Sequence, residues 1–227
     1  MPTILITAVN RGIGRALAEL YLARGWRVIG TVRDLTRDGG ARQLADEGRL
    51  KLIALDVRDE ASISAAANAV DEPLDALINN AGVIGPDRQS PLDMDFDGFA
   101  DTLNINVLGP LRIVQAFLPQ LRRAKSARIL TISSRMGSHE SGKSNRIAYR
   151  ASKAAVNRLM QGLATDLAGE GIAVCVAHPG WVQTDMGGSG ADISAQESAA
   201  GLARLIDGLS LKNTGAFYNY DGSTIPW

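Results

Sequence analysis

Apolar and polar positions along the chain follow two repeats, one typical of buried strands and one typical of amphipathic helices. Runs rich in Val, Ile and Leu predict strands over residues 3–8, 26–32, 50–55, 74–79, 128–133 and 172–177, with a last short strand over 215–220. Apolar residues at helical spacing predict helices over 13–24, 43–47, 60–70, 95–123, 148–168 and 194–209. Strands and helices are therefore expected to alternate along almost the whole chain.

This alternation predicts an α/β fold, a single Rossmann-like, doubly wound parallel sheet of about seven strands with helices on both faces. Strands that are almost continuously apolar fit a parallel sheet, which is covered on both sides. No linker, low-complexity segment or internal repeat divides the sequence, so residues 1–227 are expected to form one domain. Ligands of such sheets bind beyond the carboxyl ends of the strands, which is where candidate site residues are sought.

Composition excludes several classes of function. The 24 Lys and Arg balance 24 Asp and Glu, which leaves no electrostatic footprint for nucleic acid or for an anionic membrane. The first residues do not form a signal peptide, and no apolar run approaches the ~20 residues that span a bilayer. The single cysteine, Cys175, excludes an internal disulfide, and two histidines without an acidic cluster make a metal site unexpected. A cytoplasmic protein with no nucleic-acid or membrane partner is expected.

The first predicted strand runs into a turn with two glycines, Gly12 and Gly14, directly before a predicted helix. Glycines let the backbone approach a pyrophosphate, whose charge is favoured by the free N–H groups and the dipole of the helix. The spacing differs from the G-x-G-x-x-G fingerprint, and two glycines in a turn can also simply end a strand. By itself this turn is a moderate indication of a dinucleotide site.

The end of the second predicted strand bears on which dinucleotide would bind. An NAD site has a carboxylate there for the ribose 2′-hydroxyl, whereas this strand ends in Val32 and is followed by Arg33. Together with Arg11 in the first turn, Arg33 could pair with a 2′-phosphate, which favours NADP(H) over NAD(H). The alternative is that Arg33 is a solvated loop residue and that Asp34 supplies the carboxylate.

The strongest candidate for chemistry is the pair Tyr149 and Lys153 near the start of a predicted helix. A separation of four residues places the two side chains one turn apart on the same face, although such pairs also occur by chance. An ammonium beside a phenol lowers the pKa of the phenol from ~10 towards neutrality, so Tyr149 could act as a general acid. A serine at the end of a strand, Ser133 or Ser134, could donate to a carbonyl oxygen, and an asparagine of the long helix, Asn104 or Asn106, could hold a water.

These motifs, taken in chain order, resemble those of the short-chain dehydrogenase/reductase family. The first turn is similar to its T-G-x-x-x-G-x-G turn, with Ala8 in place of the first glycine, a change that is tolerable if the φ angle of Ala8 is negative. Residues 79–82 match its N-N-A-G motif, and the serine, Y-x-x-x-K and P-G motifs follow in family order. Further segments, 134–138, 178–182, 184–188 and 219–227, resemble the sniffer/C-factor-like carbonyl reductases.

The resemblance implies an NADPH-dependent oxidoreductase that reduces a carbonyl compound, an aldehyde, ketone or quinone, to an alcohol. It implies that Tyr149 is the general acid and that Lys153 lowers its pKa and holds the nicotinamide ribose. Ser134 would orient the carbonyl and Asn106 would hold a relay water. The implied cofactor contacts are Thr7, Asn10, Arg11, Gly12, Ile13, Gly14, Arg33, Asp56, Val57, Asn80, Ala81, Gly82, Tyr149, Lys153, Pro179, Gly180, Val182 and Thr184.

Several expectations have alternatives. Asp56 could instead cap the following helix. An NAD(P)-bound regulatory or signalling protein with little turnover is the alternative to an enzyme. The family also implies a homodimer or homotetramer built on the long helices, with Leu111, Phe117, Leu159 and Leu163 at the interface or, equally, in the core.

Three further segments and His178 carry expectations of their own. The loops 135–147 and 186–194 are expected to select the substrate, the second as a short glycine-rich lid over an open site. His178 is expected to be a satisfied structural histidine. The acidic stretch 93–97 is expected to mark the start of a helix.

Overall fold

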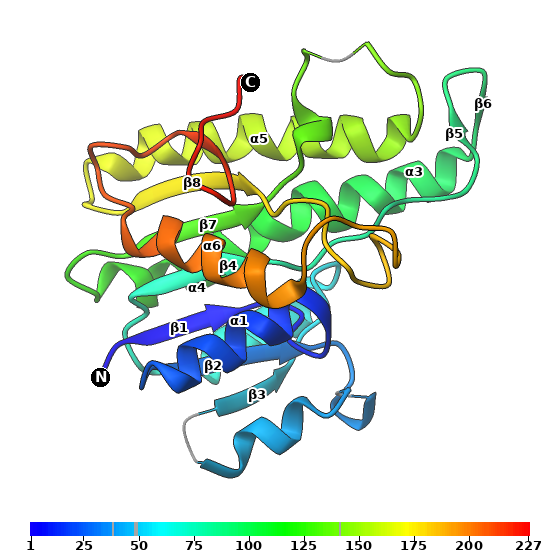
Figure 1. Cartoon of the computed structure of the whole chain (residues 1–227). Coiled ribbons are helices and arrows are strands. Elements are labelled where there is room, and N and C mark those ends of the chain that lie inside the picture. The colour runs from blue at the N-terminus through cyan, green and yellow to red at the C-terminus, as the bar shows by residue number, and fades with distance from the viewer. Residues whose placement is uncertain (38, 48–49, 141) are drawn as a thin grey trace.

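The computed structural model describes residues 1–37, 39–47, 50–140 and 142–227, and within them seven strands form one parallel sheet (Figure 1). Its order is β3-β2-β1-β4-β7-β8-β9, so the direction of winding reverses between β1 and β4. The predicted doubly wound sheet is confirmed, and its ligand crevice belongs at the carboxyl ends of those two strands. The strands are β1 (Thr3–Ile6), β2 (Arg27–Val32), β3 (Leu50–Ala54), β4 (Ala76–Asn79), β7 (Arg128–Ile132), β8 (Ala173–His178) and β9 (Phe217–Asn219).

Helices cover both faces of the sheet because alternate strand residues point to opposite sides. Ile4 and Ile6 pack with α1 (Gly12–Ala23) and α6 (Ala195–Asp207), whereas Leu5 packs with the helices of the other face. Those helices are α2 (Glu60–Asn68), α4 (Gly109–Arg122) and α5 (Ile147–Ala168). Two short 3-10 turns, η1 (Leu35–Arg37) and η2 (Ala41–Glu47), lie between β2 and β3, and a third, η4 (Arg135–Gly137), follows β7.

The helical region predicted over 95–123 is interrupted by a π-helical turn. Helix α3 (Phe96–Leu103) leads into η3 (Asn104–Leu108), and α4 follows directly. Pro110 has no N–H to continue the α-helical ladder, and an inserted residue of this kind is frequent at functional sites. Asp95 caps α3 by accepting from the N–H of Gly98 at 2.9 Å, so the acidic stretch does mark a helix start.

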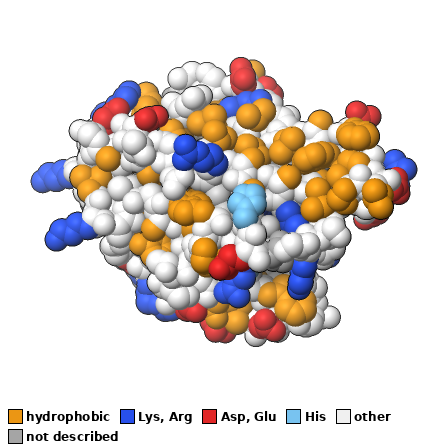
Figure 2. All heavy atoms as spheres, turned by 90° about the horizontal axis from the view of Figure 1, so that it is seen from above, with side chains coloured by type: hydrophobic (Ala, Val, Ile, Leu, Met, Phe, Trp, Pro, Cys, Tyr) orange, Lys and Arg blue, Asp and Glu red, His pale blue; other side chains and the backbone are white. Residues whose placement is uncertain are grey.

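A small antiparallel hairpin, β5 (Gln89–Ser90) and β6 (Asp93–Met94), was not predicted. It projects from the molecule beside the start of α3 (Figure 1). Leu92 is 98% exposed and Phe96 is 78% exposed, and hydrophobic side chains gather at this end of the molecule (Figure 2). Gln89, at the root of the hairpin, is buried.

Two further features concern a possible cysteine nucleophile and possible membrane-spanning helices. Cys175 is buried in β8, where burial raises the pKa of its thiol to about 12, so it is the expected core residue. No helix in the described part of the chain is both long and apolar enough to cross a lipid bilayer.

Candidate active site

The ends of β1 and β4 are joined by side-chain hydrogen bonds at the crevice. The Thr7 hydroxyl accepts from the N–H groups of Asn80 and Ala81, both at 2.9 Å. In return, Nδ2 of Asn80 donates to the carbonyl oxygens of Thr7 at 2.9 Å and Ala8 at 3.2 Å. A Cβ on Gly14 would collide with that Ala8 oxygen and with the Asn80 amide. Thr7, Asn80 and Gly14 thus shape the first turn.

Ala8 adopts the left-handed conformation, with a φ of +58°. The condition for tolerating an alanine here, a negative φ, is therefore not met. For a residue with a Cβ this conformation costs roughly 1–2 kcal/mol. The surrounding hydrogen bonds hold Ala8 in this conformation, which is strained for alanine and would not be strained for glycine.

The start of α1 can receive a phosphate group. Its N-cap residue, Arg11, makes no side-chain cap, and no acidic residue occupies the first turn. No cap side chain therefore accepts a hydrogen bond from the first N–H groups of the helix. Uncapped N–H groups at a helix start are the kind of site that binds pyrophosphate. Gly12, with a φ of +55°, lies against the methyl group of Thr184, and Arg11 forms an ion pair with Asp185. The segment after β8 thus lies directly over the first turn.

The two residues that bear on cofactor type differ in their surroundings. Asp34 accepts from the N–H of Thr36 at 2.8 Å and from its hydroxyl at 2.6 Å, and these bonds lower the pKa of the carboxyl. Arg33 is exposed and makes no hydrogen bond or ion pair with the described residues. The Asp34 carboxylate is therefore already hydrogen-bonded to Thr36, whereas the Arg33 guanidinium could bind a ligand.

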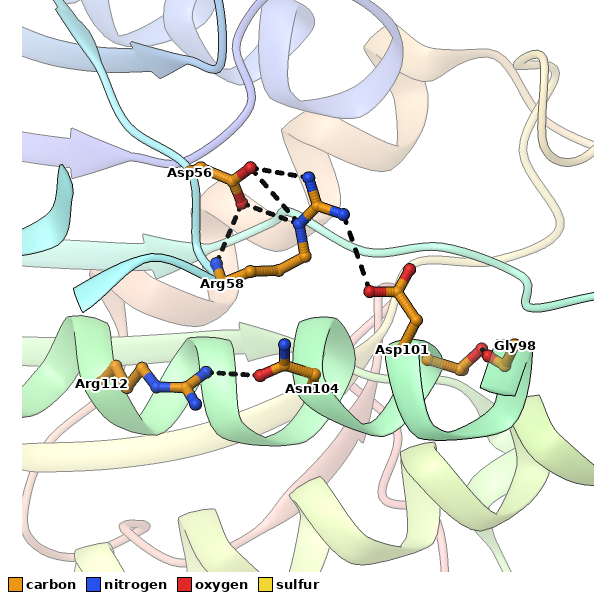
Figure 3. A network of polar contacts seen from close by, with 7 residues as sticks. Asp56, Arg58, Gly98, Asp101, Asn104 and Arg112 are labelled. Atoms are coloured by element: carbon orange, nitrogen blue, oxygen red, sulfur yellow. Dashed lines mark hydrogen bonds and ion pairs between the residues drawn. The ribbon is translucent and has the colours of Figure 1, made fainter. Parts of the chain in front are cut away.

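Asp56 does not cap the next helix, because Asp59 does so by accepting from the N–H of Ala61 at 2.9 Å. Figure 3 shows Asp56 facing Arg58, which in turn faces Asp101 of α3. Arg58 donates from Nε at 3.1 Å and from Nη2 at 2.8 Å. These bonds lower the pKa of the Asp56 carboxyl and keep it charged beside Val57.

The candidate catalytic groups meet at the carboxyl ends of β4 and β7. Tyr149 and Lys153 are both buried, with the Lys153 ammonium 5.6 Å from the centre of the Tyr149 ring. Lys153 donates to the carbonyl oxygen of Ile132 at 2.9 Å. Ser134 follows β7, caps η4 by accepting from the N–H of Met136 at 3.1 Å, and lies beside the Tyr149 phenol. The structure thus brings these three predicted residues together.

Burial decides the protonation of Tyr149 and Lys153. It raises the pKa of the Tyr149 phenol, and the Ser134 hydroxyl and the Arg146 charge offset this only in part. It lowers the pKa of Lys153 to about 8. The net direction for Tyr149 is opposite to the one expected from the pair alone, because removing a charge from water outweighs its polar neighbours here.

Asn106 lies in the π-helical turn, and its side-chain amide makes three hydrogen bonds within the protein. Nδ2 donates to the carbonyl oxygen of Val83 at 2.8 Å and to the hydroxyl of Ser152 at 3.0 Å, and Oδ1 accepts from the N–H of Val83 at 2.9 Å. One lone pair of Oδ1 remains for a water. Ser152 was not singled out from the sequence, although it lies inside the Y-x-x-x-K motif.

Ser133 and Ser134 are adjacent in sequence but have different surroundings. The Ser133 hydroxyl donates to Oδ1 of Asn157 at 2.5 Å in the interior, whereas Ser134 borders the phenol of Tyr149. This supports the choice of Ser134 as the candidate site residue.

The segment after β8 forms a loop fixed at its base. Gly180 has a φ of +87°, and Val182 pairs with Ile193 across the loop. The N–H of Gln183 also donates to the Ile193 carbonyl oxygen at 2.9 Å, and the Pro179 carbonyl accepts from the Ser198 hydroxyl at 2.6 Å. The expected lid is therefore a short loop anchored at both ends.

His178 is not satisfied as expected. Its Nδ1 is buried without a partner among the described residues, and burial lowers the pKa of the ring to about 4. With this lowered pKa, the His178 ring at the end of β8 is neutral at pH 7. In the described ranges no three His, Cys, Asp or Glu side chains gather as metal ligands.

Comparisons with known proteins relate the whole chain to others of known family or structure. The family model described as short chain dehydrogenase matches residues 2–193. The C-signal protein of Myxococcus xanthus is 45% identical over 164 residues, 71% of this chain and 98% of that protein. An NADPH-bound carbonyl reductase from chicken fatty liver has 34% identity and a TM-score of 0.93, covering 100% of this chain and 99% of its own. The carbonyl reductase Sniffer of D. melanogaster has 30% identity and a TM-score of 0.93, with both chains fully covered.

Proposed function

Because the chain belongs to the short-chain dehydrogenase/reductase family of oxidoreductases, we propose that it reduces a carbonyl compound to an alcohol with NADPH. One observation carries the proposal: Tyr149, Lys153 and Ser134 meet in a buried site on the same sheet edge as the uncapped, glycine-containing turn that opens α1. Structural neighbours that are carbonyl reductases, one of them NADPH-bound, support the substrate class and the cofactor.

The residues divide the chemistry among them. NADPH, when bound, would supply a hydride to the carbonyl carbon. Ser134 donates a hydrogen bond to the carbonyl oxygen, and Tyr149 gives that oxygen its proton as negative charge develops. The raised pKa of Tyr149 keeps the phenol protonated at neutral pH, which suits a proton donor. Lys153, with a pKa of about 8, is cationic there and would pass a proton to the tyrosinate that this transfer leaves, and a water held by Asn106 would return a proton to the lysine from solvent.

The cofactor would lie across the switch point of the sheet. The N–H groups of Gly12, Ile13 and Gly14 would hold the pyrophosphate, and Asn10 would border it. Asp56 and Val57 would flank the adenine. Residues 80–82 would border the nicotinamide, and Pro179, Gly180, Val182 and Thr184 would bind its carboxamide.

We assign the preference for NADP(H) to Arg33 and Arg11. A 2′-phosphate would meet an exposed guanidinium at Arg33, and the nearby Asp34 is already held by Thr36. Arg11 would have to leave Asp185, which is inexpensive because an exposed ion pair contributes at most about 1 kcal/mol. Charge-assisted bonds to phosphate contribute about 1.5–3 kcal/mol, so the exchange is favourable.

Titration of the purified protein with NADPH and with NADH, followed by nicotinamide fluorescence, tests the cofactor. We expect tight NADPH binding and weak NADH binding. Arg33→Ala should weaken NADPH binding by roughly tenfold or more and leave NADH binding unchanged. Arg88→Ala, which removes an exposed guanidinium on the distant hairpin, is the matched control. Equal affinity for both cofactors would contradict the assignment.

A screen of carbonyl compounds tests the reaction. The lid segment is short, so we propose that the site is open and that aldehydes, ketones and quinones of different shapes are reduced. NADPH oxidation should be observed with several of them. A strong preference for one bulky steroid-like ketone would contradict an open site.

A second candidate function is regulatory, an NAD(P)-bound protein with little turnover. The 45% identity with a protein named C-signal favours keeping it. Tight NADPH binding without turnover on any carbonyl compound would support this candidate over the enzyme.

We also propose assembly as a homodimer or homotetramer. Phe117 is fully buried in the core, so it is not an interface residue, whereas Leu111, Leu159 and Leu163 are only partly buried. Light scattering tests the proposal, and elution at the monomer mass would contradict it.

A further inference from the structure

We infer that Gln89, at the root of the β5–β6 hairpin, is a positioning residue for the catalytic tyrosine. Its amide joins the start of α5, which carries Tyr149, to the loop that follows β4. The inference rests on the proposed role of Tyr149, and it assigns a function to a hairpin that the sequence did not predict.

The start of α5 needs an external hydrogen-bond partner. Tyr149 is the third residue of the helix, so its N–H has no partner within the helix. The N-cap residue, Arg146, is in the left-handed conformation with a φ of +55° and makes no side-chain cap. Gln89 takes this place from outside the helix, because its Oε1 accepts from the N–H of Tyr149 at 3.1 Å.

The other end of the same amide holds the loop after β4. Nε2 of Gln89 donates to the carbonyl oxygen of Pro86 at 2.7 Å and to that of Ile84 at 3.2 Å. The Gln89 residue is 6% exposed, so these bonds form away from water, where an unpaired polar group is costly. One acceptor and two donors match the three surrounding backbone groups, which a carboxylate or an apolar side chain of the same length cannot do.

A second link reaches Tyr149 from the other side. The Ser152 hydroxyl donates to the Tyr149 carbonyl oxygen at 2.7 Å and accepts from Asn106 at 3.0 Å. Asn106 in turn pairs with both backbone groups of Val83, next to Ile84. Both polar backbone groups of Tyr149 are thus tied, through Gln89 and Ser152, to the loop after β4.

This loop continues from residues 80–82, where the nicotinamide end of the cofactor would lie. Gln89 therefore fixes the phenol relative to the place where hydride is delivered. A misplacement of about 1 Å at a reacting group can cost roughly 100-fold in rate, so a positioning contact of this kind is expected to affect the chemical step.

Gln89→Met tests the inference because methionine keeps the length of the side chain and removes all three bonds. Gln120→Met is the matched control: Gln120 is also buried, and its Nε2 also donates to two backbone carbonyls, those of Ala67 and Val70, both at 3.0 Å. Both variants of the full chain are compared by NADPH-dependent reduction of 9,10-phenanthrenequinone and by hydrogen exchange of the Tyr149 amide.

We expect kcat of Gln89→Met to fall roughly 10- to 100-fold while its KM for NADPH stays within about twofold. The Tyr149 amide should exchange roughly tenfold faster than in the unchanged protein, and Gln120→Met should alter neither quantity. Equal kcat in the two variants, or unchanged exchange of the Tyr149 amide, would overturn the inference. If the unchanged protein reduced no carbonyl compound, the proposed function would fail, and the exchange measurement would still decide whether Gln89 holds Tyr149.

Discussion

The Lys153 ammonium lies 5.6 Å from the centre of the Tyr149 ring and donates its hydrogen bond to the carbonyl oxygen of Ile132. Both side chains are buried, so desolvation lowers the pKa of the lysine and raises that of the tyrosine. At neutral pH the Tyr149 phenol is therefore protonated and the Lys153 side chain is a charged ammonium. This is the protonation state that carbonyl reduction requires.

Lys153 should make stability depend on pH in a specific direction. Burial lowers its pKa from 10.5 to about 8, so between these values the unfolded chain binds more protons than the folded one. Raising the pH through this window removes the cost of burying the ammonium, and stability rises. Relative to Lys153→Met, the unchanged protein should gain about 1.5 kcal/mol in free energy of unfolding between pH 8.0 and 9.5.

Urea unfolding of both proteins without cofactor measures this gain. The comparison with Lys153→Met cancels groups common to both, among them Cys175, whose raised pKa acts in the opposite direction above pH 9. Parallel pH profiles of the two proteins would show that Lys153 does not titrate in this window.

Substituting the two adjacent serines one at a time should affect different quantities, kcat for Ser134 and stability for Ser133. Ser134→Ala should lower kcat roughly 100-fold, because a donor to the developing oxyanion is lost, with the affinity for NADPH unchanged. Ser133→Ala should keep kcat within about twofold and cost about 1 kcal/mol of stability, because Asn157 loses its buried partner. Steady-state kinetics and urea unfolding of the two variants check this, and equal losses of kcat would refute the assignment of Ser134.

The strain at Ala8 should be measurable. Ala8→Gly relieves a left-handed alanine but adds the entropy of glycine, so we expect a net gain of about 0.5–1 kcal/mol in stability. Gly25→Ala is the reverse control, since Gly25 has a φ of +79° and open space around its Cβ position. It should lose about 1 kcal/mol. Thermal unfolding compares the two, and no gain for Ala8→Gly would mean that the turn relaxes when alanine is present.

Much of the fold was predictable because it depends on apolar periodicity. The parallel strands are buried on both faces, so their Val, Ile and Leu runs stand out. The break in the long helix was indicated only by Gly109 and Pro110, and periodicity does not distinguish a π-helical turn from an α-helical one. The hairpin of residues 89–94 was missed because its paired strands are only two residues each.

The site was predictable where it depends on motif spacing and not where it depends on tertiary contacts. Tyr149, Lys153 and Ser134 come together as expected. Gln89 gave no sequence signal, since its role arises from a hairpin folding against the start of α5. The direction of the Tyr149 pKa shift was also missed, because spacing says nothing about burial.

The role of Tyr149 as general acid is tested most directly by Tyr149→Phe, assayed for NADPH affinity and for carbonyl reduction on the same preparation. Phenylalanine keeps the ring and removes the proton donor. We expect kcat to fall roughly 1,000-fold while the Kd for NADPH stays within about threefold. A variant that still reduces carbonyl compounds at the rate of the unchanged protein would contradict Tyr149 as the general acid.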